Sequence, residues 1–245
     1  MEYEKYKPPV RVMALWCAEL MLLSCLIGKL FYGSFSVGLM GIAGIPFYVR
    51  SKAKQLCQRR KQELLVQFQD LIRSYSTALK AGYSVENAFK EAYADLKYLY
   101  EDKALIMMEC ARMVDRMKNG HGIDELMLDL GKRSGLEDIT DFASVFSVAK
   151  KSGGNLGAMI ADTTQRISEK LSVTEEIRLM FASKALDQRI MNLVPVGIML
   201  YILLGNPDYF EPLYKNAAGI AIMTAALGLY AAAYFLARKI MDIRI

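Results

Sequence analysis

The sequence predicts an all-α integral membrane protein in which four transmembrane helices, arranged as two hairpins, flank a cytoplasmic antiparallel helical bundle. Hydrophobic residues make up 53% of the 245-residue chain, yet 23% of it is charged and the mean hydropathy is +0.18. Long apolar runs lie near both ends, whereas apolar residues in the central part recur at helical spacing. No stretch sustains the alternation expected of a strand.

The N-terminal part, residues 1–61, contains the first predicted hairpin. Residues 12–28 carry one charge, that of Glu19, and a second apolar run, residues 30–49, follows at once. A signal peptide would end in a cleavage site after a shorter apolar core, so the pattern favours two spans joined through residues 28–34. Glycines in the second run could let another helix approach closely, although such glycines are also simply common in membrane helices.

Glu19 is the candidate intramembrane polar contact. A carboxylate inside a span costs roughly 2.5–3.5 kcal/mol on insertion scales, so it must pair, become protonated or reach water. It could contact a partner helix, face the interior of the membrane helices, or lie shallower than the apolar run suggests. The sequence leaves these alternatives open.

Basic residues lie next to the apolar runs. Residues 50–61 contain six Lys or Arg and no acid, a pattern that marks the cytoplasmic side of a span and could also contact lipid headgroups. Residues 62–189 carry 17 basic and 20 acidic residues, a net charge of −3, which leaves +8 for the rest of the chain. A nucleic-acid-binding face is therefore not expected.

Residues 62–189 are predicted to form the cytoplasmic bundle, with about six helices. The first ends near residue 79, the next four cover residues 85–97, 100–118, 124–133 and 137–151, and the last starts at residue 156 and can continue into the membrane. The positions predicted to face the core are Leu64, Phe68, Leu71, Tyr75, Leu79, Ile106, Cys110, Met113, Met117, Ile139, Phe142, Phe146, Ala149, Leu156, Ile160, Thr163, Ile167, Leu171 and Thr174.

Two turns organise this bundle. Gly82 can supply the left-handed residue that ends the first helix, and Ser84 can accept from the free N–H groups of the second. Gly120 lies in a further break.

The second organising turn follows two lysines and contains Gly153, Gly154 and Asn155. A phosphate site is the alternative there, but the segment lacks the lysine of a phosphate-binding loop and follows a helix.

The C-terminal part, residues 190–245, contains the second predicted hairpin. Residues 190–207 and 217–237 are uncharged runs of 18 and 21 residues. At about 1.5 Å per residue, each can cross a hydrocarbon core of roughly 30 Å. Lys29 and Lys215 are the only basic residues in the two short connections, whereas other basic residues gather at both termini and at the ends of the central block. This asymmetry predicts that both termini and the bundle are cytoplasmic.

Catalytic and metal-binding patterns are missing from the sequence. It has no phosphate-binding loop, and the single histidine, His121, has no second histidine or suitably spaced cysteine beside it. We therefore predict neither an enzyme nor a cofactor or metal site. A small membrane transporter would carry more polar residues inside its spans, and a membrane-anchored signalling protein would have a larger outer domain.

Three motifs together resemble the type II secretion system F domain family. They are LKAGYSVENAF at residues 79–89, KNGHGIDELM at 118–127 and SGGNL at 152–156. The segment NPDY at residues 206–209, followed by a final span and a basic tail, is similar to the Tad branch of tight-adherence (Flp, type IVc) pili, and to its TadB-like members most.

The resemblance implies an inner-membrane platform that links a hexameric cytosolic secretion ATPase to the extraction and assembly of pilin subunits. Larger F proteins carry two copies of the soluble domain, whereas this chain has one. The resemblance therefore also implies pairing with a second copy of itself or with a related single-copy, TadC-like membrane protein. Transport across the membrane and membrane-anchored signalling are the competing functions.

Overall fold

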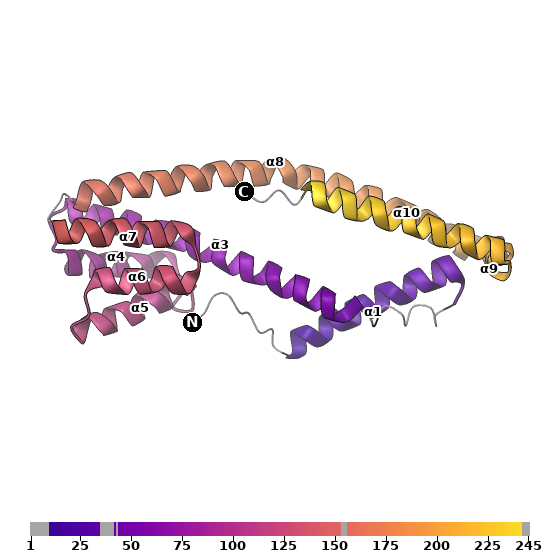
Figure 1. Cartoon of the computed structure of the whole chain (residues 1–245), viewed down its shortest axis with the longest axis horizontal. Coiled ribbons are helices and arrows are strands. Elements are labelled where there is room, and N and C mark those ends of the chain that lie inside the picture. Colours follow the sequence, from indigo (N-terminus) through magenta and orange to yellow (C-terminus); the bar gives the residue numbers. More distant parts are fainter. Residues whose placement is uncertain (1–9, 35–41, 43, 153–155, 242–245) are drawn as a thin grey trace. The chain divides into compact units, whose positions relative to one another are not determined.

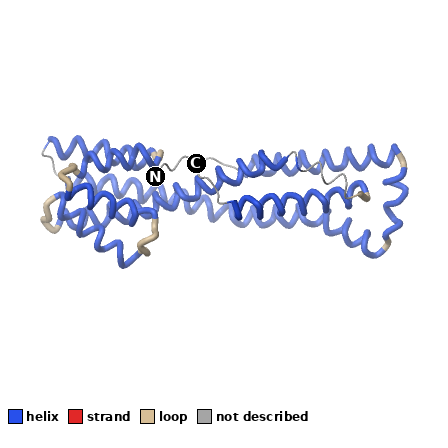
Figure 2. The backbone as a smooth tube through the Cα atoms, turned by 90° about the horizontal axis from the view of Figure 1, so that it is seen from below, coloured by secondary structure: helices blue, strands red, loops and turns tan. Residues whose placement is uncertain are grey.

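The computed structural model describes residues 10–34, 42, 44–152 and 156–241, and it is helical almost throughout. The described residues contain no strand, and short loops or turns connect most successive helices (Figure 2). The predicted all-α class is therefore confirmed. The chain divides into two compact units, and the boundaries between them fall within α3 (Ile45–Lys80) and α8 (Leu156–Gly205).

The first unit, called the bundle unit, contains Ala53–Val173 and holds five complete or partial helices besides the first part of α8. Most of α3 is followed by α4 (Val85–Leu99), α5 (Leu105–Lys118), α6 (Ile123–Ser134) and α7 (Glu137–Ser152). Helices α6 and α7 form a close hairpin, and α5 packs against both α4 and α6 (Figure 1). The helices predicted at residues 85–97, 124–133 and 137–151 match α4, α6 and α7 within two residues at each end.

The core of the bundle unit is built from the apolar stripes that helical spacing predicts. Phe68 and Tyr75 of α3 are fully buried, as are Phe142 and Phe146 of α7. The Phe68 ring meets the edge of Phe142 with centroids 5.3 Å apart, and Phe142 stacks on Phe146 at 6.0 Å. Aromatic pairs in these geometries stabilise a core beyond their buried area by about 0.5–1.5 kcal/mol each.

One helix of the bundle starts later than predicted. The helix expected from residue 100 begins at Leu105, because Tyr100 is extended and its hydroxyl donates to Asp70 Oδ2 at 2.5 Å. The cap residue of α5, Ala104, has no side-chain acceptor, and the buried amide of Ile106 instead donates to Gln67 Oε1 at 3.0 Å. A tertiary contact from α3 thus fixes where α5 starts, which a local pattern does not reveal.

The second unit, called the membrane unit, contains Pro8–Lys52 and Thr174–Ile245. It holds α1 (Val10–Tyr32), the start of α3, the C-terminal part of α8, the short helices η2 (Pro207–Phe210) and α9 (Glu211–Lys215), and α10 (Ala217–Met241). Among the described residues, three helical segments are long and apolar enough to cross a membrane, namely Arg11–Tyr32, Leu186–Gly205 and Ala217–Ala237. The first and third pack together, since α1 contacts α10.

The end of the first predicted span differs from the prediction. Gly28, Lys29 and Leu30 continue α1 instead of ending it, because Leu30 and Phe31 are buried against Met223 of α10. The helix stops at Gly33, which has a φ of +64°. Of the second predicted span, residues 30–49, the last five belong to the start of α3, and residues 35–41 and 43 lie outside the described residues.

Candidate functional site

The turn between α3 and α4 has the geometry that glycine makes accessible. Gly82 has a φ of +90°. Its amide donates to Leu79 O at 3.1 Å, and the amide of Tyr83 donates to Ala78 O at 3.2 Å, which together form a Schellman motif. A Cβ added at Gly82 would meet open space, so the backbone conformation alone constrains this position.

Ser84 occupies the N-cap position of α4, but the capping hydrogen bond that we predicted for its side chain is absent. Its backbone is extended, with φ −62° and ψ 156°, and its side chain makes no capping hydrogen bond. The turn is held instead from the core, because the Tyr75 hydroxyl donates to Val85 O at 3.1 Å. Burial raises the pKa of Tyr75 well above its ordinary value, and the negative charge of Glu86 adds to this, so the phenol stays a donor.

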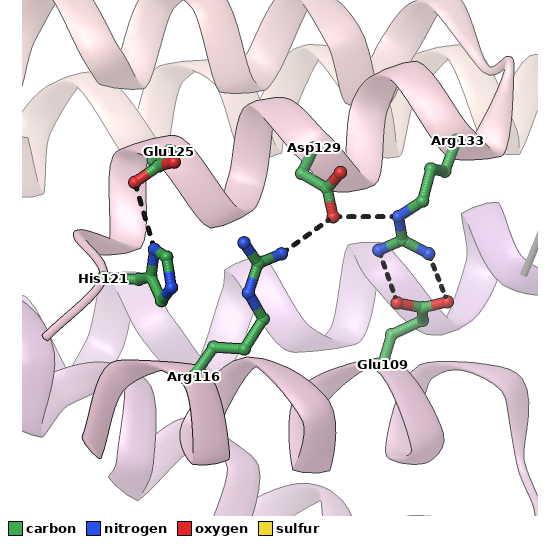
Figure 3. A network of polar contacts seen from close by, with 6 residues as sticks. All are labelled: Glu109, Arg116, His121, Glu125, Asp129 and Arg133. Carbon is green, nitrogen blue, oxygen red and sulfur yellow. Dashed lines mark hydrogen bonds and ion pairs between the residues drawn. The ribbon is translucent and has the colours of Figure 1, made fainter. Parts of the chain in front are cut away.

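The turn after α5 repeats the same device. Gly120 has a φ of +85°, its amide donates to Met117 O, and the amide of His121 donates to Arg116 O. The His121 ring is exposed and lies 3.5 Å from Glu125 Oε2 (Figure 3). This contact joins the turn to the first turn of α6 and does not build a ligand set. The remaining predicted motif residues, Gly153, Gly154 and Asn155, lie outside the described residues.

A third glycine turn, at Gly135, was not predicted. Gly135 caps α6 in the left-handed conformation with a φ of +60°. Just before it, Gly131 lets α6 approach α7, since a Cβ there would lie 2.9 Å from Thr140 Cα. The signal was present in the sequence as a glycine two positions after the basic pair of Lys132 and Arg133 at a helix end.

A charged cluster joins α5 to α6 (Figure 3). The guanidinium of Arg133 donates to both carboxylate oxygens of Glu109 at 2.9 and 2.7 Å, and its Nε donates to Asp129 Oδ2 at 2.9 Å. Arg116 reaches the same Asp129 oxygen at 3.4 Å. The Glu109 side chain is 3% exposed and that of Arg133 is 17% exposed, so the pair is largely removed from water.

This cluster ties two helices by a bidentate pair, which fixes orientation as well as distance. The hydrogen bonds from Glu109, supported by those from Asp129, raise the pKa of Arg133 above its ordinary value although partial burial opposes this. The guanidinium therefore stays charged at every pH at which the protein is folded. Sequence reasoning missed the cluster, because no residue spacing on a single helix points to it.

A second ion-pair group gathers three helices. Lys150 Nζ, near the end of α7, lies 3.0 Å from Asp124 Oδ1 and 3.3 Å from Glu86 Oε1, in the first turns of α6 and α4. Partial burial works against charge on both Lys150 and Asp124. The mutual contact outweighs it, so the pKa of Lys150 is raised and that of Asp124 is lowered. The helix dipoles favour the same arrangement, because Asp124 and Glu86 lie at the positive N-terminal ends of their helices and Lys150 lies at the negative C-terminal end of α7.

The membrane unit has its own polar contacts. Glu19 Oε2 lies 3.9 Å from Lys52 Nζ, and both side chains are more than a third exposed. The carboxylate thus has a basic neighbour on α3 in this structure. Two further hydrogen bonds join α1 to its neighbours. The hydroxyls of Tyr32 in α1 and Thr224 in α10 lie 3.1 Å apart, and the Tyr214 hydroxyl in α9 donates to Leu30 O in α1 at 2.6 Å.

None of these groups assembles catalytic chemistry. Among the described residues, no three His, Cys, Asp or Glu side chains converge as a metal site would require. The polar clusters instead connect helices to one another. This arrangement is typical of a structural domain whose surfaces bind other proteins.

Comparison with known proteins gives the family. The model of the family described as type II secretion system (T2SS), protein F, matches residues 71–204, which is more than half of the chain. The chain belongs to this family. The match runs from within α3 to the end of the Leu186–Gly205 segment, so it includes the three glycine turns and both ion-pair groups. No curated protein and no solved structure shows significant similarity to the chain.

Family membership defines the general role. Members are non-enzymatic membrane components, and this F-family chain is accordingly a multi-pass, platform-like protein of secretion or pilus machinery. The family implies a secretion ATPase and the pilin machinery as partners in general terms. The candidate functional site is therefore the set of surfaces that the bundle unit presents, held in place by the turns and ion pairs described above.

Proposed function

We propose that the chain is the inner-membrane platform of a Tad (Flp, type IVc) pilus or of a closely related secretion machine, and that it couples a hexameric cytosolic ATPase to pilin extraction and assembly. The observation that carries the proposal is the protein F match over a single helical bundle. The NPDY segment at residues 206–209, followed by a final apolar helix and a basic tail, supports the Tad branch.

Helix α8 supports a mechanical role. Its first part contributes Ile160 and Ile167 to the core of the bundle unit, and the same helix later includes the apolar segment Leu186–Gly205. A displacement imposed on the bundle by a motor could therefore act along one continuous element. Such coupling requires two arrangements of the machine that the motor and the pilin favour differently.

The proposed topology has four spans, with both termini and residues 62–189 in the cytoplasm, residues 1–61 forming the first hairpin and residues 190–245 the second. Basic residues at 50–61 and in the C-terminal tail support this orientation. The proposed span that is not among the three apolar segments named above is the second along the chain, between α1 and the basic part of α3. Cysteines placed at Ser34 and Tyr209 should react with a membrane-impermeant reagent in intact cells, and a cysteine at Ser84 only after permeabilisation. Labelling of the Ser84 position in intact cells would contradict the proposal.

Deletion of the gene tests the role itself. Loss of surface pili with pilin still present in the membrane is expected, because the platform would act after pilin insertion. Complementation with the parent chain should restore assembly. A deletion strain that assembles pili and secretes normally would refute the platform role, and solute uptake by vesicles reconstituted with the pure protein would favour transport instead.

A further inference from the structure

The start of α3 carries an exposed stripe that combines one aromatic side chain with two cations. Phe47 is 75% exposed although it belongs to the membrane unit, and Arg50 and Lys54 are exposed as well. The three positions follow the spacing i, i+3 and i+7 in one uninterrupted helix, so they lie within an arc of about 60°. Helix geometry alone therefore places the ring and the two positive charges on one face.

The structure separates these two cations from two neighbouring lysines of the same helix. Lys52 Nζ lies 3.9 Å from Glu19 Oε2, and Lys61 Nζ donates to a backbone carbonyl oxygen of the turn after α6 at 3.2 Å. The side chains of Arg50 and Lys54, in contrast, form no ion pair or hydrogen bond with any residue that the structure describes. Within this part of the chain, their charges are available to a ligand from outside.

The stripe follows the order of groups in an anionic phospholipid. Residues 45–49 are uncharged, and Arg50 is the first charged residue of α3. Along the helix axis, Arg50 lies about 4.5 Å and Lys54 about 10.5 Å beyond Phe47. Helical side chains lean toward the N-terminus, so both charged groups reach back toward the apolar start of the helix. An acyl chain against Phe47 would therefore place the phosphate of the same lipid between the two cations.

We propose that Phe47, Arg50 and Lys54 bind an anionic phospholipid, with an acyl chain against the Phe47 ring and the phosphate held by the two cations. An anionic headgroup is preferred to a zwitterionic one, because the cation of a zwitterionic headgroup cancels the charge that Arg50 and Lys54 attract. The site requires that the chain lies in a membrane, as its family and its apolar helical segments indicate. It requires neither the pilus role nor the orientation proposed above, so its failure would leave both untouched.

Quenching of a tryptophan by brominated lipids measures binding at this position. The full-length chain carries Phe47→Trp and Trp16→Phe, so that the new tryptophan is its only one, and is reconstituted in bilayers of phosphatidylglycerol and phosphatidylcholine, with bromine on the chains of either lipid. Phosphatidylglycerol should bind beside residue 47 about tenfold more tightly than phosphatidylcholine. Tyr201→Trp in the same Trp16→Phe background, at an aromatic position that is 79% exposed, is the matched control and should show no preference.

Removal of single charges then tests the site. Arg50→Gln and Lys54→Gln should each reduce the preference for phosphatidylglycerol about fivefold, because each removes one cation near the headgroup. Arg50→Lys keeps the charge and should keep the preference. Arg59→Gln is the matched control, since Arg59 is an exposed cation of the same basic segment but lies about 140° around the helix from Lys54, and it should leave the preference unchanged. Each variant must melt like the parent to be compared.

Several results would overturn the inference. Equal quenching by the two lipids at residue 47 would show that no anionic lipid is selected, and quenching by neither would show that protein covers the stripe. An equal loss of preference in Arg59→Gln and Lys54→Gln would assign it to the diffuse charge of the segment, and an equal preference at residue 201 to the whole membrane surface. Excess soluble glycerol phosphate should leave the preference intact, because it has no acyl chain; its loss would indicate a phosphate site in place of a lipid site.

Discussion

The ion pair between Glu109 and Arg133 offers the sharpest test of what holds the bundle unit together. Arg133→Met removes a guanidinium that makes two hydrogen bonds to a carboxylate only 3% exposed. Removing one partner of a buried pair typically costs about 3–5 kcal/mol, because the other charge stays in the interior. Since Arg133 is itself 17% exposed, we expect the lower end, about 3 kcal/mol.

Hydrogen exchange on the full-length protein in detergent measures this effect locally. A loss of about 3 kcal/mol corresponds to roughly a hundredfold faster exchange of core amides in α5 and α6, if those amides exchange through opening of this helix pair. Arg166→Met is the matched control, because its ion pair with Asp162 is exposed on both sides and should be worth about 1 kcal/mol or less.

A double replacement tests whether the loss of protection comes from leaving the Glu109 carboxylate buried without its partner. Glu109→Leu combined with Arg133→Met exchanges the pair for apolar side chains and should recover most of the lost protection. The reasoning is refuted if Arg133→Met exchanges like the parent, or if the double variant exchanges faster than the single one. Either outcome would mean that the buried carboxylate does not depend on Arg133.

Three further predictions concern the turns and the second ion-pair group. Gly82→Val should lower the stability of the full-length protein by roughly 1–2 kcal/mol or more through its φ of +90°, whereas Tyr83→Ala, at an exposed side chain, should not; equal thermal midpoints for both would refute the role of the turn. Gly131→Ala should cost about 1–3 kcal/mol, because the new Cβ would lie 2.9 Å from Thr140 Cα; an unchanged midpoint would show that α6 and α7 can separate freely. The stabilisation from Lys150 should be complete below its ordinary pKa of 10.5 and disappear as pH rises through its higher folded value, whereas that from Asp124 should be complete above 3.8 and disappear as pH falls through its lower folded value. Lys150→Met should remove both dependences from the midpoint-against-pH curve, and a curve unchanged in shape would contradict the assignment.

Much of the bundle unit could be predicted from the sequence, because its helices and turns are specified by residues close together in the chain. The stripe of Leu64, Phe68, Leu71 and Tyr75 is buried as its spacing predicts, and α7 begins at Glu137 as expected. A glycine with a serine two positions later, between two periodic segments, also located the turn at Gly82. Periodicity and turn chemistry depend on neighbours in the chain, so they can be recognised without the fold.

What was missed depends on how helices face one another. The Glu109 and Arg133 pair forms because two helices meet in one rotational register, which neither periodic pattern specifies. The start of α5 depends on Gln67 from a distant helix, and the end of α1 depends on burial of Leu30 against α10. The absence of a capping hydrogen bond from Ser84 has a similar origin, since Tyr75 from the core holds that turn.

Co-purification from native membranes tests the central claim most directly. The full-length chain, extracted in mild detergent with a C-terminal affinity tag, should retain a hexameric ATPase of the secretion class. ATP hydrolysis in the eluate should follow the ATPase and disappear when its gene is deleted, because the family to which the chain belongs is non-enzymatic. Recovery of the intact chain without any secretion ATPase from cells that assemble pili would contradict the account, as would ATP hydrolysis that persists in the deletion strain.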